Sequence, residues 1–242
     1  MKIYFQKIIK FNYFVFLILL SYSCDAGGNG VNILYMFDTS GSFYKNALPA
    51  CLSLSTEIFS ELKNDNSGLG IYPQFHQVVT IDEQSVDIGK NCGVKVEQSN
   101  IFKKETMNQN QTLDNCLELV KGDNYSIYTD LVGALLNASK AFESGGFYGK
   151  GLIIFSDLHE DVPDIKKYNF DLSGVSVFII HEFSKEQLQN PEIFQNDKKR
   201  IKNLLLNSGC NEKDILFRNL SSVITSPNEV VSFFRQSFRD NR

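Results

Sequence analysis

The stretch Ile33-Leu-Tyr-Met-Phe-Asp38-Thr-Ser40-Gly-Ser42 joins an unbroken apolar run of strand length to a cluster of oxygen-bearing side chains. Its first five residues are typical of a strand buried on both faces, and its last five are typical of a loop. Two other segments repeat this arrangement. The Thr129-Asp130 pair opens a helical pattern, and Gly151-Leu-Ile-Ile-Phe-Ser-Asp157 ends an apolar run on an acid. The pattern predicts polar side chains where several elements of one sheet end.

These segments carry the oxygen ligands that a hard divalent cation prefers. Asp, Ser and Thr supply carboxylate and hydroxyl oxygens, and the absence of Cys and His favours Mg²⁺, Mn²⁺ or Ca²⁺ over zinc. In open parallel α/β sheets, ligands bind outside the carboxyl ends of the strands, where loops distant in sequence converge. We therefore expect a metal site at that edge. Taken singly, each segment also fits an ordinary helix cap or turn, and only their combined order indicates a metal.

Together the segments resemble the metal-ion-dependent adhesion site of von Willebrand factor type A domains, whose pattern is Asp-x-Ser-x-Ser, a distant Thr and a distant Asp. All five positions are filled, by Asp38, Ser40, Ser42, Thr129 and Asp157. The resemblance implies that Ser40, Ser42 and Thr129 coordinate the cation through hydroxyl oxygens, whereas Asp38 and Asp157 act mainly through bound water and hydrogen bonds. It also implies an open coordination position for a carboxylate from a protein partner.

One departure from the family pattern follows the last of these positions. The chain continues Leu158-His159-Glu160-Asp161, where many family members have a glycine after the aspartate. The added histidine and acids are candidates for supporting the metal ligands or for selecting the partner. We interpret the segment as a solvated loop.

The rest of the sequence alternates between strand and helix patterns. Continuous apolar runs predict strands at Ile33–Phe37, Leu152–Phe155 and Val175–Ile180. Apolar spacings of three and four residues predict helices over residues 45–64, 131–142, 191–208 and 227–238, with a helical turn over 162–168 and a last strand over 214–220. Apolar strands separated by helices indicate an α/β fold, doubly wound, with a mostly parallel central sheet flanked by helices. This order is expected of a von Willebrand type A-like domain over residues 31–240.

Residues 82–116 interrupt the alternation. Before them, Leu69–Phe75 and Gln77–Ile81 are interpreted as two short strands that form a candidate hairpin. Residues 82–112 are polar and rich in Gln, Asn and Lys, with too few apolar residues to build a core. We interpret this segment as a long polar excursion of the domain, without strands of its own.

Residues 1–23 have the features of a secretory signal peptide. Lysines precede the apolar run Tyr13–Leu20, which is too short to cross a bilayer as a mature helix. The following Leu20-Ser-Tyr-Ser23-Cys24 resembles a bacterial lipoprotein processing site, which implies lipidation of Cys24 and a flexible linker over residues 24–30. The alternative is an ordinary signal peptide cut near Ser23. We expect a cell-envelope protein anchored on the periplasmic side or at the cell surface or, under the alternative, a secreted protein.

The charge balance bears on the class of partner. Removal of residues 1–23 takes away three lysines and leaves 21 basic and 28 acidic residues, a net charge of −7. Such a surface repels phosphate, so we exclude nucleic acid as a partner.

The cysteine count fits an oxidising compartment. With Cys24 as the lipid anchor, Cys51, Cys92, Cys116 and Cys210 remain, an even number that is compatible with two disulfides. Because Cys92 and Cys116 flank much of the polar excursion, we predict the pairs Cys92–Cys116 and Cys51–Cys210 among three possible connectivities. The alternative is that Cys51 and Cys210 are small buried apolar residues.

Binding rather than catalysis is the function that these features favour. Asp38 after the first strand resembles the nucleophile of haloacid-dehalogenase-type phosphatases, but Ser40 stands where those enzymes have a second acid. The sequence also lacks the Gly-x-Ser-x-Gly, His-Glu-x-x-His and phosphate-loop motifs. We predict a non-enzymatic module that binds a protein through the cation. The alternative is a scaffolding subunit of an envelope secretion or conjugation complex, in which the metal is only structural.

Overall fold

The computed structural model describes residues 30–64, 69–71, 73–82, 91–96, 113–118, 120–121, 126–143, 146–160 and 168–240. The predicted signal peptide, the lipidation site Cys24 and nearly all of the helical turn predicted over 162–168 lie outside these residues. Ser42 and Asn91 belong to a helix and a strand, but their side chains are not described.

A six-stranded sheet forms the centre of the molecule, in the order β3-β2-β1-β4-β5-β6. Its strands are β1 (Val31–Asp38), β2 (Gln74–Ile81), β3 (Asn91–Val96), β4 (Gly149–Ser156), β5 (Val175–His181) and β6 (Ile215–Asn219). Every neighbouring pair is parallel except β2 and β3, which are antiparallel. The predicted α/β fold with a mostly parallel central sheet is confirmed.

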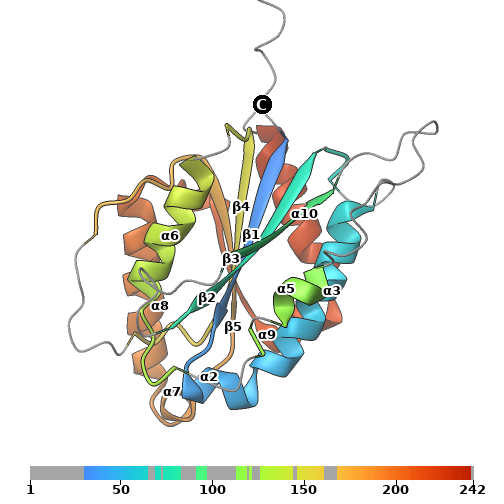
Figure 1. The fold of residues 1–242 in the computed structure, drawn as a ribbon. Coiled ribbons are helices and arrows are strands. Elements are labelled where there is room, and N and C mark those ends of the chain that lie inside the picture. Colours follow the sequence, from blue (N-terminus) through green and yellow to red (C-terminus); the bar gives the residue numbers. More distant parts are fainter. Residues whose placement is uncertain are drawn as a thin grey trace, which may run out of the picture.

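Helices cover both faces of this sheet (Figure 1). They are α2 (Gly41–Asn46), α3 (Leu48–Lys63), α5 (Leu113–Leu117), α6 (Leu131–Glu143), α7 (Lys185–Gln189), α8 (Pro191–Asn207), α9 (Leu220–Thr225) and α10 (Asn228–Asp240), with a 3-10 turn at Glu212–Asp214. Pro191 stands in the first turn of α8, where a missing backbone N–H costs nothing. Within the described ranges, no helix combines the length and apolar character needed to cross a membrane.

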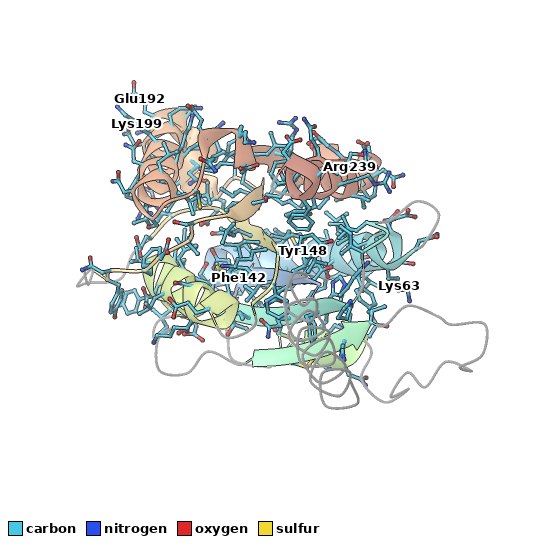
Figure 2. The ribbon with its side chains drawn as sticks, turned by 90° about the horizontal axis from the view of Figure 1, so that it is seen from above. Lys63, Phe142, Tyr148, Glu192, Lys199 and Arg239 are labelled. Carbon is cyan, nitrogen blue, oxygen red and sulfur yellow. A yellow bond between two sulfur atoms is a disulfide. The ribbon has the colours of Figure 1, made fainter. Side chains whose placement is uncertain are left out.

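The two faces of the sheet bury separate cores. Ile33, Tyr35 and Phe37 of β1 face the core made with α3, α5, α9 and α10, whereas Leu34 and Met36 face the core made with α6 and α8. Because the strand is covered on both sides, all eight of its residues are buried, which explains its continuous apolar sequence. Figure 2 shows the helices on either side of the sheet, with the charged side chains of α8 and α10 along the outer rim.

The interpretation of residues 69–112 is wrong in two respects. β2 is one strand that pairs in parallel with β1, so the candidate hairpin does not form. β3 lies inside the segment that we interpreted as strandless, and it pairs antiparallel with β2. Its sequence, Asn-Cys-Gly-Val-Lys-Val, has only two strongly apolar residues, Val94 and Val96, and both are buried. An edge strand stabilised mainly by pairing gives little signal in hydrophobicity.

The cysteines confirm one predicted pair and contradict the other. Cys92 of β3 and Cys116 of α5 form a disulfide across 24 positions of sequence. Closure of a loop of this size stabilises a fold by about 3 kcal/mol in the chain-entropy account. Cys51 and Cys210 are free and buried. Cys51 lies in the core on one face of the sheet and Cys210 in the core on the other, so the sheet itself separates the two thiols.

The parallel strands give the sheet two unlike edges. The carboxyl ends of β1, β2, β4, β5 and β6 lie together at what we call the carboxyl edge, the lower end in Figure 1, beside α2 and α7. β1 begins at the opposite edge, close to where α10 ends (Figure 1). The predicted metal ligands belong to the segments at the carboxyl edge.

Candidate metal centre

Asp38 is the last residue of the central strand β1, and its side chain is fully buried. The parallel register pairs Phe37 with Phe155, which brings Asp38 beside Ser156 at the end of β4. The Ser156 hydroxyl donates a hydrogen bond of 2.6 Å to Asp38 Oδ2. The backbone N–H of Ser40 donates a hydrogen bond of 2.9 Å to Asp38 Oδ1. Both carboxylate oxygens are thus fixed from two different strand ends.

The segment before α6 is attached to the same edge by backbone hydrogen bonds. The Ser126 N–H donates to the Thr39 carbonyl at 2.9 Å, and the Ser126 carbonyl accepts from Gly41 N at 3.1 Å. A few residues later, Asp130 N donates to the carbonyl of Asp82, directly after β2, at 2.9 Å. Thr129, which lies between these attachments, is 2 % exposed. A threonine distant in sequence is therefore held beside the Asp38 loop.

Asp130 has a different role from Thr129. Its Oδ1 accepts a 2.8 Å hydrogen bond from Gly133 N, as expected of a cap at the start of α6. The two residues that we singled out in the sequence therefore have different roles. Asp130 stabilises the start of α6, and Thr129 lies at the carboxyl edge.

Asp157 follows β4 directly and is 2 % exposed. Its Oδ1 accepts a 3.0 Å hydrogen bond from His159 N, and its carbonyl accepts a 2.8 Å hydrogen bond from Gln187 Nε2 on α7. The side chain and the backbone of Asp157 are therefore both fixed at the carboxyl edge.

The hydroxyl of Ser40 differs from these hydrogen-bonded groups. Its Oγ is buried and has no hydrogen-bond partner among the described residues. Buried hydroxyls are almost always bonded, because an unpaired one loses its hydration without compensation. Asn32, Ser176 and His181 also bury one unpaired atom each, but Ser40 is the only one of the four that is bonded to Asp38. An unpaired hydroxyl oxygen beside a buried carboxylate is suited to accept a cation.

The electrostatics of the site also favour a cation. The pKa of Asp38 is raised to about 7, mainly because burial desolvates the carboxyl group and also because the negative charge of Asp157 is near, against the lowering effect of the hydrogen bonds from Ser156 and Ser40. Two acids thus share a desolvated edge at which ionisation of both is unfavourable. A divalent cation at this edge would oppose both charges at once.

In its described residues, Leu158 to Glu160, the loop after Asp157 is not a solvated loop, contrary to our interpretation, and Asp161 lies outside the described part of the chain. Leu158 is buried with a φ of 66°, a left-handed conformation that is strained for a leucine and free of strain for glycine. The Glu160 side chain is completely buried, accepts from Val132 N at 3.1 Å and forms an ion pair with Arg200 of α8. Arg200 also donates to the Leu158 carbonyl at 3.1 Å. The loop is therefore fixed between α6 and α8.

Four of the five predicted ligands lie on segments that the structure joins at one edge: Asp38, Ser40, Thr129 and Asp157. Ser42 lies in the first turn of α2, close in the chain to Ser40, and its side chain is not described. Among the described residues no three His, Cys, Asp or Glu side chains cluster as a metal site would require. The predicted set has only two acids and relies on hydroxyls, so it is compatible with that finding.

Sequence reasoning did not identify the groups that support these residues. Ser156, Gln187 and Arg200 each fix a part of the site, and two of them lie on helices of the carboxyl edge and the adjoining face. For Ser156 the sequence did carry a signal. This serine is the last residue of β4, and a parallel register places it beside Asp38, the last residue of the neighbouring strand β1. Gln187 and Arg200 belong to helical patterns that carry no local sign of the contact.

Comparison with known proteins supports the fold. No family model matches the chain, and no curated protein matches it. The von Willebrand factor domain of the type V pili tip protein Mfa5 from Porphyromonas gingivalis is similar in structure, with a TM-score of 0.55 and 9 % identity over 88 % of this chain and 97 % of that one. At this identity the likeness shows that the chain shares the fold of a von Willebrand factor type A domain.

Other solved structures are similar over a part of their length. Proximal thread matrix protein 1 from the mussel byssus matches with a TM-score of 0.46 and 13 % identity over 87 % of this chain. The pilus adhesin SpaC from Lactobacillus rhamnosus GG matches with a TM-score of 0.48 and 12 % identity over 88 % of this chain. The chain spans 48 % of the mussel protein and 31 % of SpaC.

The buried acid predicts a pH dependence of stability for the metal-free protein. The pKa of Asp38 is about 7 in the fold and near 3.8 when unfolded, so its stabilising contribution is complete below about pH 4 and is lost as the pH rises to 7. Urea unfolding in EDTA should show wild type losing stability relative to Asp38→Asn across this window, by at most about 1.4 kcal/mol per pH unit. Parallel curves for the two proteins would show that Asp38 ionises normally.

Proposed function

We propose that this chain is an exported module that binds a protein partner through a divalent cation, Mg²⁺ or its substitutes Mn²⁺ and Ca²⁺, at the carboxyl edge of its sheet. The observation that carries the proposal is the buried Ser40 Oγ, which lacks a hydrogen-bond partner among the described residues and lies beside the buried carboxyl of Asp38. The fold shared with von Willebrand factor type A domains and the filled five-residue pattern support the same function.

The residues divide into hydroxyls that would hold the cation and acids that would orient its surroundings. Ser40, Ser42 and Thr129 offer neutral oxygens. Asp38 and Asp157 offer negative charge, and the Asp38 oxygens already accept hydrogen bonds from Ser40 and Ser156. When bound, the cation would supply an electrophilic centre that accepts a carboxylate oxygen from outside the chain. A hard cation suits this set because none of the donors is sulfur or imidazole.

We further propose that the chain is held at a membrane of the bacterial envelope by a lipid on Cys24. This part rests on the sequence before Val31. The geometry is compatible with an anchor that precedes β1, because β1 begins at the edge opposite to the one that carries Asp38 (Figure 1). With eight residues at about 3.3 Å each, β1 separates an anchor at its start from the metal edge by roughly 25 Å. The lipid would then be joined to the domain at the edge opposite to the site, through the flexible linker predicted over residues 24–30.

The first test is the affinity for Mg²⁺ by isothermal titration calorimetry. Asp38→Ala should abolish binding, and Ser40→Ala should weaken it at least about tenfold, or 1.4 kcal/mol, because a directly coordinating oxygen is lost. Ser40→Ala should lower the free energy of unfolding of the metal-free protein by no more than about 1 kcal/mol, because that hydroxyl makes no hydrogen bond of good geometry among the described residues and only helps to lower the pKa of Asp38.

Ser60→Ala is the matched control for this test, since Ser60 is an exposed serine in the last turn of α3, at the other end of that helix from α2. It should bind Mg²⁺ as wild type does. Equal affinity in wild type, Asp38→Ala and Ser40→Ala would refute the metal site. Loss of metal in Asp38→Ala with partner capture unchanged in EDTA would instead favour the scaffolding alternative, in which the cation is structural.

The second test concerns the anchor. Mass spectrometry of the protein extracted from its native membrane should find an amino terminus at Cys24 that carries lipid, and Cys24→Ser should release the protein into the soluble fraction. Cys51→Ser is unsuitable as a control because Cys51 is buried in the core, so Ser23→Ala, which keeps a small residue before the cysteine, serves instead. An amino terminus at another bond would leave export without anchoring.

A further inference from the structure

Large apolar side chains are exposed at few places in the described part of the chain. Four reach the surface, namely Ile127, Tyr128, Leu188 and Ile224. The first three belong to the two segments that hold Thr129 and Asp157 in place, so they lie at the carboxyl edge. Exposed apolar groups that gather at one site indicate an interaction surface more strongly than scattered ones do.

Ile127 and Tyr128 are held outward by the backbone on either side of them. Ser126, just before them, is hydrogen-bonded in both directions to the Thr39–Gly41 loop, and Thr129, just after them, is buried. Ile127 is 70 % exposed in spite of these anchors. Its exposure is therefore imposed by the same attachments that bring Thr129 to the metal edge.

Leu188 lies beyond Asp157, on α7. The helix begins with a capping box in which Ser184 and Gln187 exchange hydrogen bonds, and Gln187 is 1 % exposed and bonds to the Asp157 carbonyl. The residue next to it, Leu188, is 65 % exposed. Because α7 uses its buried side to fix Asp157, its apolar residue is left facing solvent.

We propose that Ile127, Tyr128 and Leu188 form an apolar rim beside the candidate cation site, and that the partner is a protein segment with an acidic side chain between apolar ones. The inference rests on the proposed function and adds a specificity to it. The full chain carries a net charge of −4, and the chain without residues 1–23 carries −7, so an acidic partner is repelled in general and is favoured only beside a bound cation. The rim then favours a partner with apolar side chains on either side of its acidic residue. A phosphate or a sugar ligand has no such side chains.

Fluorescence anisotropy of the purified full chain with labelled synthetic peptides tests this inference. The peptides place Asp or Asn at the centre and either Leu and Phe or Ser and Gln on both sides, in buffer with MgCl₂ or with EDTA. We expect the Asp-centred peptide with apolar flanks to bind at least about tenfold more tightly than the one with polar flanks. Replacement of the rim by Ile127→Ser with Leu188→Ser should remove that difference and leave Mg²⁺ affinity unchanged.

Ile224→Ser is the matched control, because Ile224 is an exposed isoleucine on α9, which follows β6 rather than a strand that carries a predicted ligand. It should keep the preference for apolar flanks. The rim is overturned if the preference for apolar flanks persists in the rim variant, or if wild type shows no such preference. In either case, binding that still requires Asp in the peptide and Mg²⁺ in the buffer keeps the proposed function. Failure of every peptide to bind wild type overturns the rim as well. Light scattering that shows wild type, but not the rim variant, as a dimer assigns the surface to a second copy of the chain and overturns the proposed partner.

Discussion

The carboxyl group of Asp38 is buried at the end of the central strand, close enough to the acid Asp157 for the two charges to interact. A desolvated carboxylate near a second acid is stable only with compensation, through protons, hydrogen bonds or a cation. Ser156 and Ser40 supply hydrogen bonds to Asp38, yet burial still raises the pKa of Asp38 to about 7. The local structure is therefore built around a charge that its own hydrogen bonds do not fully balance, and the unpaired Ser40 hydroxyl lies beside it.

This constraint depends on the topology of the sheet. β1 is central, with β2 and β4 on its two sides, so its carboxyl end is the point that the loops after three strands can all reach. The β1–β4 register brings Ser156 to Asp38, and the contact of Asp82 with Asp130 brings the α6 segment to the end of β2. A slip of one residue in β1 would turn Asp38 to the other face and remove the site. The two apolar cores fix that register, so packing and function depend on each other.

The sequence predicts the parts of this structure whose burial is complete. β1, β4 and β5 are apolar on both faces, and α6, α8 and α10 carry clear apolar stripes, so their patterns are unambiguous. β3 escapes prediction because an edge strand depends on pairing and on the Cys92–Cys116 disulfide. The Leu158–Glu160 loop escapes because its burial comes from Arg200, forty residues away from Glu160. The Cys51–Cys210 pairing is wrong because linear spacing does not reveal that a sheet lies between two thiols. For the site, the order of the motifs predicts which segments meet, whereas the supporting contacts of Gln187 and Arg200 require the tertiary structure.

The most direct measurement of the central claim is the position of a bound ion. Crystals of the protein grown with Mn²⁺, measured for anomalous scattering at the manganese edge, should show a peak at the carboxyl edge, at a metal–oxygen distance of about 2.0–2.6 Å from Ser40 Oγ. The account also predicts that this peak is missing from crystals of Asp38→Ala. A Ser40 hydroxyl that is hydrogen-bonded to a protein group, with manganese absent from the edge or bound elsewhere, would contradict it.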